Sequence, residues 1–430
     1  MDSGTITAFL AIGAAIFIGF FGNMVFQKFR IPDVLITILL GILIGPDLLG
    51  LVSLDTLDGI GQYRDFLLSA ALVLILFEGG LYLDIRALAE SMKLGTLIML
   101  LTLFVEILAC TLIMVLVLDI DIVLAVVFAT IIGGTSEAVV IPVANRMRIN
   151  SKTKSMLVME SMVTDVLTIT IAITLMSLIA TGSLSLMSLG REIAVNFLVG
   201  AGIGFVSGIT WLFVLQRLQQ QPLSYMLTVG ALFLVAGFVE MAPIGSSGAV
   251  AALAFGLAIG NRRVVKRWLT SLTLRLSTDN HIQDFHSEIA FFVRTFFFVY
   301  LGVLIRFDSF TPLQLAVGVG IIVVILVVRR LTSRLAMSLG DLDKEDADAI
   351  WSMMPRGLAT AVLATAPAAI LAGTVMWDQD PGFESFILNI SLIVIIGTTI
   401  LATIISFAVE RNVDSKNRKQ LRKRLAADEY

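Results

Sequence analysis

Two carboxylates stand close together within one apolar stretch of the chain. The segment ESMVTDV covers residues 160–166 and lies inside an apolar run long enough to span a membrane. A charge at the middle of a membrane costs roughly 2.5–3.5 kcal/mol on insertion scales, so an ionisable residue there is a functional candidate. On a helix, Ser161 and Asp165 share one face, whereas Glu160 lies about 100° round from Ser161. This spacing predicts that Asp165 and Ser161 offer oxygen atoms to a cavity, while Glu160 points sideways towards a basic partner.

Other ionisable residues also fall within apolar segments of membrane length. With Glu160 and Asp165 they make nine, and nine uncompensated charges would cost on the order of 25 kcal/mol. We therefore expect them to face one another or water. The further seven are Glu78, Glu106, Glu137, Arg294, Arg329, Arg330 and Arg356.

For most of these residues, the alternative to binding an ion is a structural role. Glu160 is expected to pair with one of the four arginines, which leaves Asp165 free to bind. Arg294 and Arg356 are expected to hold helix ends or carbonyl groups, because a fixed positive charge repels a cation. Glu106 has no evident partner, and we expect it to be protonated and structural.

The composition indicates a membrane protein. Of 430 residues, 57% are hydrophobic and 15% are charged, and the mean hydropathy is +0.96. Soluble domains do not reach that value. The sequence has no P-loop, no H-E-x-x-H motif, no Cys/His metal set and no Ser-His pair at plausible spacing. We therefore expect no enzyme activity, no cofactor and no nucleic-acid partner.

Apolar segments near membrane length recur along the whole chain and predict an all-α polytopic protein with about thirteen transmembrane helices. The expected spans are roughly 5–26, 31–46, 64–83, 95–118, 121–144, 156–181, 189–215, 223–241, 246–260, 288–305, 313–337, 350–372 and 384–409.

The distribution of basic residues predicts the orientation. If the N-terminus lies outside, the segments on the cytoplasmic side hold 23 of the 30 Lys and Arg residues, and the opposite loops hold three. This asymmetry agrees with the positive-inside rule. Residues 1–409 then form a single transporter domain in the cell membrane, and 410–430 form a basic cytoplasmic tail that is attracted to anionic lipid.

Two of the expected spans contain glycine and proline residues that indicate a discontinuous helix. The fifth reads FATIIGGTSEAVVIPV and the twelfth reads IWSMMPRGLATAVLATAPAAIL. They are equivalent if residues 1–182 and 223–409 form two inverted repeats joined by a linker span at 189–215. Paired discontinuous helices point to a transporter's binding site near the midplane, where unwound backbone offers carbonyl oxygens and half-helix ends offer dipoles.

In these segments the chain resembles the monovalent cation–proton antiporters of the sodium/proton exchanger type, particularly their NhaP branch. Five motifs match the family's signatures in order and spacing, and they extend over most of the chain. They are FEGGLYL at 77–83, GGTSEAVVIPV at 133–143, ESMVTD at 160–165, FFVRTFFFVYLG at 291–302 and MPRGLATAVLA at 354–364. The resemblance implies thirteen helices, a homodimer, and a six-helix core domain that moves against a dimerisation domain.

The resemblance also implies particular site residues. The implied ion ligands are Glu78, Ser161, Asp165 and the backbone of Thr135. An ion bridge is implied between Glu160 and an arginine of the eleventh span, with Arg329 as the first choice and Arg330 as the second.

The chain departs from the branch at two motifs. Thr135-Ser136-Glu137 stands where the branch usually has Thr-Asp-Pro, and Thr164-Asp165 stands where it usually has Asn-Asp. Ser136 and Thr164 can still offer oxygens. Glu137 is an accessory candidate, as are Arg294 and Arg356, and it replaces the lost charge only if the unwound backbone turns it inward. These departures leave the ion selectivity open.

Together these features predict a secondary antiporter that exchanges Na⁺ or Li⁺ for H⁺ by alternating access and serves pH homeostasis. A cation and a proton compete for Asp165, and one titrating aspartate indicates electroneutral exchange. The alternatives are K⁺/H⁺ antiport on the same fold, a cation channel and an organic-anion transporter. His281 and His286 are expected to be solvated at the membrane interface, and a role in pH sensing stays open.

Overall fold

The computed structural model describes most of the chain. It covers residues 13, 16, 17, 19–21, 24, 32–52, 64–83, 85–147, 149–182, 186–218, 223–241, 247–268, 281–340, 342–374, 377 and 383–428.

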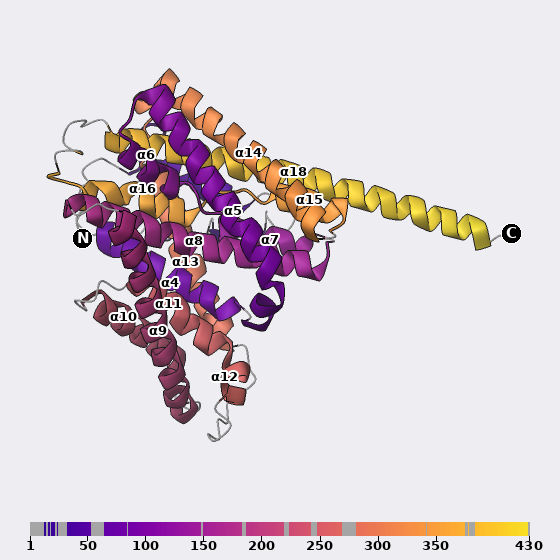
Figure 1. Cartoon of the computed structure of the whole chain (residues 1–430), viewed down its shortest axis with the longest axis horizontal. Coiled ribbons are helices and arrows are strands. Elements are labelled where there is room, and N and C mark those ends of the chain that lie inside the picture. The colour runs from indigo at the N-terminus through magenta and orange to yellow at the C-terminus, as the bar shows by residue number, and fades with distance from the viewer. Residues whose placement is uncertain are drawn as a thin grey trace.

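All the regular elements within these residues are helices, as the sequence predicts (Figure 1). They are α2 (Asp33–Ile44), α4 (Arg64–Tyr82), α5 (Ile85–Leu118), α6 (Ile122–Ile131), α7 (Glu137–Arg146), α8 (Ser151–Ala180), α9 (Leu186–Leu218), α10 (Ser224–Met241), α11 (Gly248–Gly260), α12 (Arg262–Trp268), α13 (His281–Val303), the 3₁₀ turn η1 (Phe307–Ser309), α14 (Pro312–Gly340), α15 (Lys344–Ser352), α16 (Leu358–Ile370) and α18 (Phe383–Asp428).

Seven described helices are long and apolar enough to cross a membrane. They lie in α5, α8, α9, α10, α13, α14 and α18, and five shorter apolar helices accompany them. Each expected span from the second to the thirteenth overlaps one of these twelve helices, whereas the first lies largely outside the described residues. The exact number of thirteen spans and the inverted repeats therefore stay predictions.

The helices form two packing groups. In one group, α5, α6, α7, α8, α14, α15, α16 and α18 contact one another, and in the other α2, α4, α9, α10, α11 and α13 do. In Figure 1, α5, α14 and α18 lie in the upper part of the molecule, and α9 to α12 lie in the lower part. The seam between the groups includes contacts of α8 with α9 and of α16 with α13 and α4.

Glycines let helices of the second group approach closely. A Cβ atom on Gly80 of α4 would collide with the main chain of α11 at Leu253, and one on Gly41 of α2 would collide with the main chain of α13 at Val299. Small residues at such contacts bring backbones together, which is how membrane helices gain packing energy without a hydrophobic driving force. Gly80 therefore fixes the close approach of α4 to α11 two residues after Glu78.

Two segments of the first group are non-helical where the sequence predicts discontinuous helices, and that each flanking helix pair forms one broken span stays a prediction. Residues 132–136 separate α6 from α7, and 353–357 separate α15 from α16. Pro355 has no N–H to continue a helix. The two interruptions touch, because the N–H of Ser136 donates to the Pro355 carbonyl at 2.7 Å. A Cβ atom on Gly357 would collide with the Ser136 hydroxyl, so this contact needs glycine.

The last helix runs from the bundle through the basic tail. Helix α18 contains 46 residues and ends at Asp428, and it projects beyond the other helices in Figure 1. Residues 411–428 contain neither Gly nor Pro and are rich in Lys, Arg, Gln, Leu and Ala, which are residues that favour a helix. The tail is thus continuous with the last span; its side chains beyond Arg411 lie outside the described residues.

Candidate functional site

Asp165 lies at the point where the α6–α7 interruption meets helix α8. It is buried, with 8% of its surface exposed. A Cβ atom on Gly134 would stand 2.8 Å from Oδ1 of Asp165, so the unwound main chain passes directly beside the carboxylate. The backbone N–H of Glu137, in the first turn of α7, is near enough to interact electrostatically with it. The N-terminus of a helix favours negative charge, which positions the carboxylate at this interruption.

Threonine hydroxyls connect the α6–α7 interruption to helix α8 next to Asp165 in the sequence. Thr164 Oγ1 donates to the Glu160 carbonyl at 2.8 Å and lies 3.1 Å from Thr135 Oγ1. The Thr135 N–H also donates to Thr164 Oγ1, at 3.2 Å. Ser161 is fully buried and donates to the Val158 carbonyl. Since the Ser161 hydroxyl gives its proton to a carbonyl group, its lone pairs remain available to a cation. The Thr164 oxygen already accepts from the Thr135 N–H, so a cation would have to displace that contact.

Glu160 and Arg329 form a buried ion pair away from this cluster. The two guanidinium nitrogens Nη1 and Nη2 of Arg329 contact the two carboxylate oxygens of Glu160, and Arg329 Nε donates to the Ile350 carbonyl at 3.0 Å. Neither side chain is more than 2% exposed. The second choice, Arg330, instead contacts Asp348 at 2.6 Å and lies over the ring of Trp351.

Glu106 has a partner that the sequence does not reveal. Arg356 Nη2 donates to Glu106 Oε2 at 2.6 Å, and Arg356 Nη1 donates to the Gly134 carbonyl at 2.8 Å. Arg356 therefore holds a carbonyl, as expected of it, and a carboxylate as well. The two residues are 250 positions apart, so only the packing of α5 against the α15–α16 interruption reveals the pair.

Two expectations need correction. Arg294 faces a carboxylate, because its Nη2 lies 3.7 Å from Glu78 Oε2. His286 is buried and not solvated: Nδ1 lies 2.7 Å from the Ile282 carbonyl, and the ring packs edge-on against Phe77. His286 lies on the side of α13 that packs against α4, where Phe77 stands. The side chain of His281 lies outside the described residues.

A cavity of about 1010 Å³ opens at the seam between the two groups. We call it the Glu78 vestibule. Glu78 and Glu137 line its buried part with Arg294, and the exposed side chains of Arg146 and Glu288 lie on its wall. The hydroxyl of Ser287 lies near the Glu78 carboxylate and 2.6 Å from the Tyr82 hydroxyl. Glu137 thus turns into the vestibule, where the sequence left its direction open.

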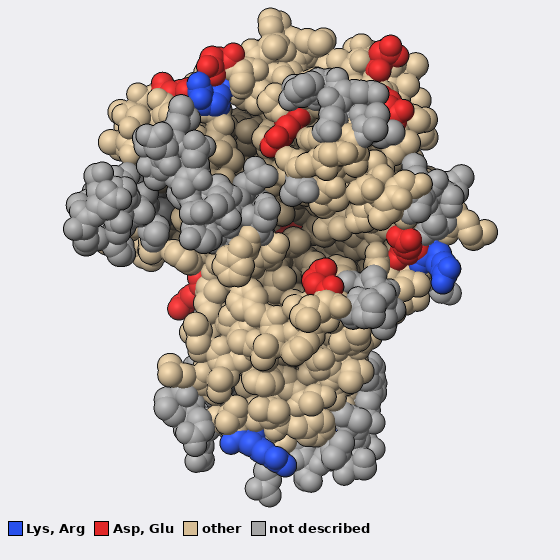
Figure 2. All heavy atoms as spheres, turned by 90° about the vertical axis from the view of Figure 1, so that its left-hand side faces the viewer, with Lys and Arg blue, Asp and Glu red and all other residues tan. Residues whose placement is uncertain are grey.

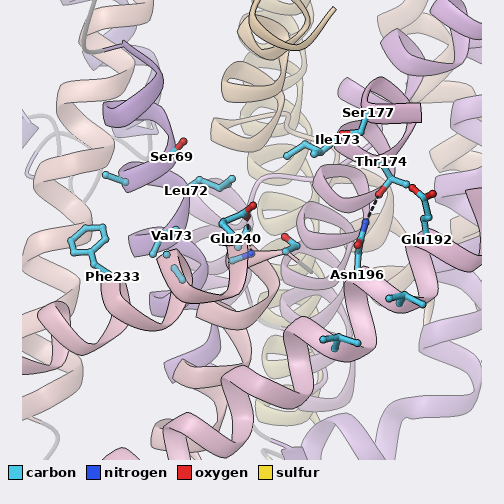
Figure 3. Close-up of a pocket in the computed structure, with 18 of the residues that line it drawn as sticks. Ser69, Leu72, Val73, Ile173, Thr174, Ser177, Glu192, Asn196, Phe233 and Glu240 are labelled. Atoms are coloured by element: carbon cyan, nitrogen blue, oxygen red, sulfur yellow. Dashed lines mark hydrogen bonds between the residues drawn. The ribbon is translucent and has the colours of Figure 1, made fainter. Parts of the chain in front are cut away.

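A second cavity, of about 1360 Å³, lies between α4, α8, α9, α10 and α11 (Figure 3). We call it the Glu240 vestibule. Figure 3 shows Glu240 and Asn196 pointing into it from α10 and α9. Glu240 accepts from the Gly248 N–H at 2.8 Å, and Asn196 donates to Thr174 Oγ1 at 3.1 Å. Helix α8 contributes 158 and 162 to the Glu78 vestibule and 173, 174 and 177 to this one. Asp165 therefore lies between the two cavities along α8.

The face turned away from the projecting end of α18 is also hollowed. Figure 2 shows a recess near its centre, and its described surface carries few basic side chains and more acidic ones.

Comparison with known proteins agrees with these features. A family model described as the transmembrane part of sodium/hydrogen exchangers matches residues 12–410. The structure of the sodium proton antiporter MjNhaP1 from Methanocaldococcus jannaschii at pH 8 is similar, with a TM-score of 0.76 and 21% sequence identity over 94% of this chain and 99% of that one. An electron-microscopy map of the same antiporter gives a TM-score of 0.70 at 21% identity, over 96% and 97% of the two chains.

These likenesses confirm the resemblance that the five motifs indicate. At 21% identity the solved structures show that the fold is similar, and the family match covers nearly the whole chain. The chain belongs to the sodium/hydrogen exchanger family and is a multi-pass membrane protein.

Proposed function

We propose that this chain is a secondary active antiporter that exchanges Na⁺, or Li⁺, for H⁺ by alternating access. One observation carries the proposal. Asp165 is buried and has no ion-pair partner among the described residues, whereas Glu160 and Glu106 each have an arginine. A buried carboxylate without a counter-charge is stable only when a proton or a cation neutralises it. Competition for this one group couples the two fluxes.

The ligand set of the proposed site lies around the α6–α7 interruption. Asp165 supplies the charge, and hydroxyl or carbonyl oxygens complete the coordination of a hard monovalent cation. Glu78 belongs to the same pathway but stands in the vestibule beside Arg294. The oxygens come from Ser161, Thr164, Thr135 and Ser136.

The seam between the two packing groups provides the means of alternating access. Asp165 lies between two cavities that touch α8 on either side of it. A displacement of the α5–α8 and α14–α18 group against the other would open one cavity to Asp165 and close the other. The ion pair of Glu160 with Arg329 and that of Glu106 with Arg356 lie within one group, so they would move as part of a rigid unit. The other group would form the interface of a homodimer.

The stoichiometry of one proton for each cation follows from Thr164, which stands beside Asp165 and carries no charge. Exchange is then electroneutral. An electrical current under ion gradients at zero voltage would refute this part of the proposal without refuting antiport.

Purified protein in liposomes with an internal pH dye tests the proposal. Addition of Na⁺, Li⁺ or K⁺ to the outside should move protons through the native chain and leave Asp165→Ala vesicles silent. The responding ion names the cargo, so a response to K⁺ alone would select K⁺/H⁺ antiport. Cation flux without proton movement would indicate a channel, and an undiminished response of Asp165→Ala would remove Asp165 from the mechanism.

A further inference from the structure

Glu137 occupies a place that the exchange mechanism above does not use. It is the first residue of α7, and 7% of its surface is exposed. Its carboxylate lines the Glu78 vestibule and lies against α4, where a Cβ atom on Gly79 would stand 3.0 Å from Glu137 Oε2. Among the described residues, no hydrogen-bond donor contacts this carboxylate. A nearly buried, unpartnered acid thus points into a cavity that is open to ions.

The position of Glu137 links the vestibule to Asp165. Its backbone N–H and its carboxylate are both near enough to interact electrostatically with the Asp165 carboxylate, and its carboxylate also interacts with that of Glu78. Glu78 and Glu137 both line the vestibule, whereas Asp165 is not among the described residues that line it. Glu137 therefore stands between the other two acids, and an ion that passes from the vestibule to Asp165 passes it.

The charges of the vestibule leave Glu137 without full compensation. In the buried part, the single guanidinium of Arg294 faces two carboxylates and lies nearer to Glu78, at 3.7 Å. Arg146 and Glu288 are both exposed on the wall, and their opposite charges sum to zero. The described lining residues therefore leave a net charge of about −1 in the buried part, where the low local dielectric makes the attraction of Glu137 for a cation strong.

We propose that Glu137 is an antechamber site, which binds the monovalent cation in the Glu78 vestibule and passes it to Asp165. This inference rests on the proposed exchange of a cation for protons, and it adds a second binding position on one side of the membrane only. The carboxylate that the chain lacks at Ser136 is thereby supplied one residue later and one step further out along the ion path.

The sidedness of transport tests the proposal. Initial rates against cation concentration are measured in everted and in right-side-out membrane vesicles for the native chain, Glu137→Gln and Glu288→Gln. The matched control Glu288→Gln removes the same charge from the exposed wall of the same cavity. Glu137→Gln should raise the KM for the cation on the order of tenfold from the vestibule side, with kcat and the KM from the other side kept. Glu288→Gln should leave both KM values within about twofold of the native ones, because exposed charges are screened.

A third variant displaces the carboxylate without removing it. Gly79→Ala should push Glu137 Oε2 away and raise the KM from the vestibule side by a smaller factor than Glu137→Gln does. An equal rise in KM on both sides for Glu137→Gln, or none on either side, would overturn the proposal, because it would assign Glu137 a general structural role or none.

Cation binding separates a failure of this inference from a failure of the exchange mechanism. Titration calorimetry with NaCl on purified Asp165→Asn protein should detect weak binding, and the double variant Asp165→Asn/Glu137→Gln should lose it. This holds even if the native chain exchanges no protons in vesicles. No binding to Asp165→Asn protein, or the same binding to the double variant, would show that Glu137 holds no cation.

Discussion

Apart from Glu78, which faces Arg294 in the vestibule, four buried acids fall into two groups, distinguished by whether an arginine contacts them. Glu160 and Glu106 each contact a guanidinium within one helix group, at 3% exposure or less. Asp165 and Glu137 lie at the seam, beside unwound backbone and a cavity, with no arginine in contact among the described residues. A buried acid and its arginine partner neutralise one another. An acid without such a partner must be neutralised by a proton or a cation, and this difference distinguishes structural acids from acids of the transport site.

The largest effect is expected at the unpaired aspartate. Asp165→Asn should abolish cation-driven proton movement in liposomes, because an amide neither releases a proton nor neutralises a cation. Its thermal unfolding temperature in detergent should equal or exceed that of the native chain, since a buried, uncompensated charge is removed. A variant that loses both transport and stability would place Asp165 among the structural acids, and the comparison would fail.

Loss of one partner from a buried ion pair should lower the stability of the protein more than it changes transport. Arg329→Met leaves Glu160 charged and buried, and it should lower the free energy of unfolding by about 3–5 kcal/mol. The double variant Glu160→Leu/Arg329→Met should recover most of this loss, because an apolar pair of similar volume replaces the ions. Denaturant unfolding in mixed micelles measures both. Equal instability of the single and double variants would indicate that Arg329 acts through the Ile350 carbonyl instead.

The second buried pair should be more tolerant. Glu106→Gln keeps an oxygen that accepts from Arg356, whose other nitrogen still holds the Gly134 carbonyl. Glu106 Oε1 has no hydrogen-bond partner among the described residues, so its replacement loses little. We expect a loss of about 1–3 kcal/mol in unfolding free energy. A loss as large as that of Arg329→Met would show that charge, and not the hydrogen bond, anchors Arg356.

The smallest effect is expected at the partly exposed pair on α14 and α15. Asp348→Asn removes the charge facing Arg330, whose side chain is 32% exposed and still rests 4.6 Å from the centre of the Trp351 ring. Exposed pairs contribute about 0–1 kcal/mol, so unfolding and exchange should both stay near native values. A clear fall in exchange rate with unchanged stability would extend the functional region to the α15 end of the interrupted segment.

Local sequence predicts the direction of Asp165 but not that of Glu137. The pattern ESMVTD correctly indicates that Ser161 and Asp165 share a helix face, because helical periodicity is a local property. The sequence also limits the possible partners of Glu160 to the four arginines that lie within apolar spans. The direction of Glu137 depends on where α7 begins after the unwound residues, and no periodicity describes unwound backbone.

The amino-acid sequence by itself determined the class of this protein. Long apolar runs specify membrane helices, because backbone N–H and C=O groups in lipid must be hydrogen-bonded within the segment. The five motifs specify the exchanger family. Tertiary structure alone decided which charges neutralise one another. Arg329, and not the adjacent Arg330, faces Glu160, and Arg356 reaches Glu106 across 250 residues. Such pairings depend on the rotation and packing of whole helices, which combine many weak contacts from distant parts of the chain, whereas the cost of an isolated charge in lipid is visible in a single span.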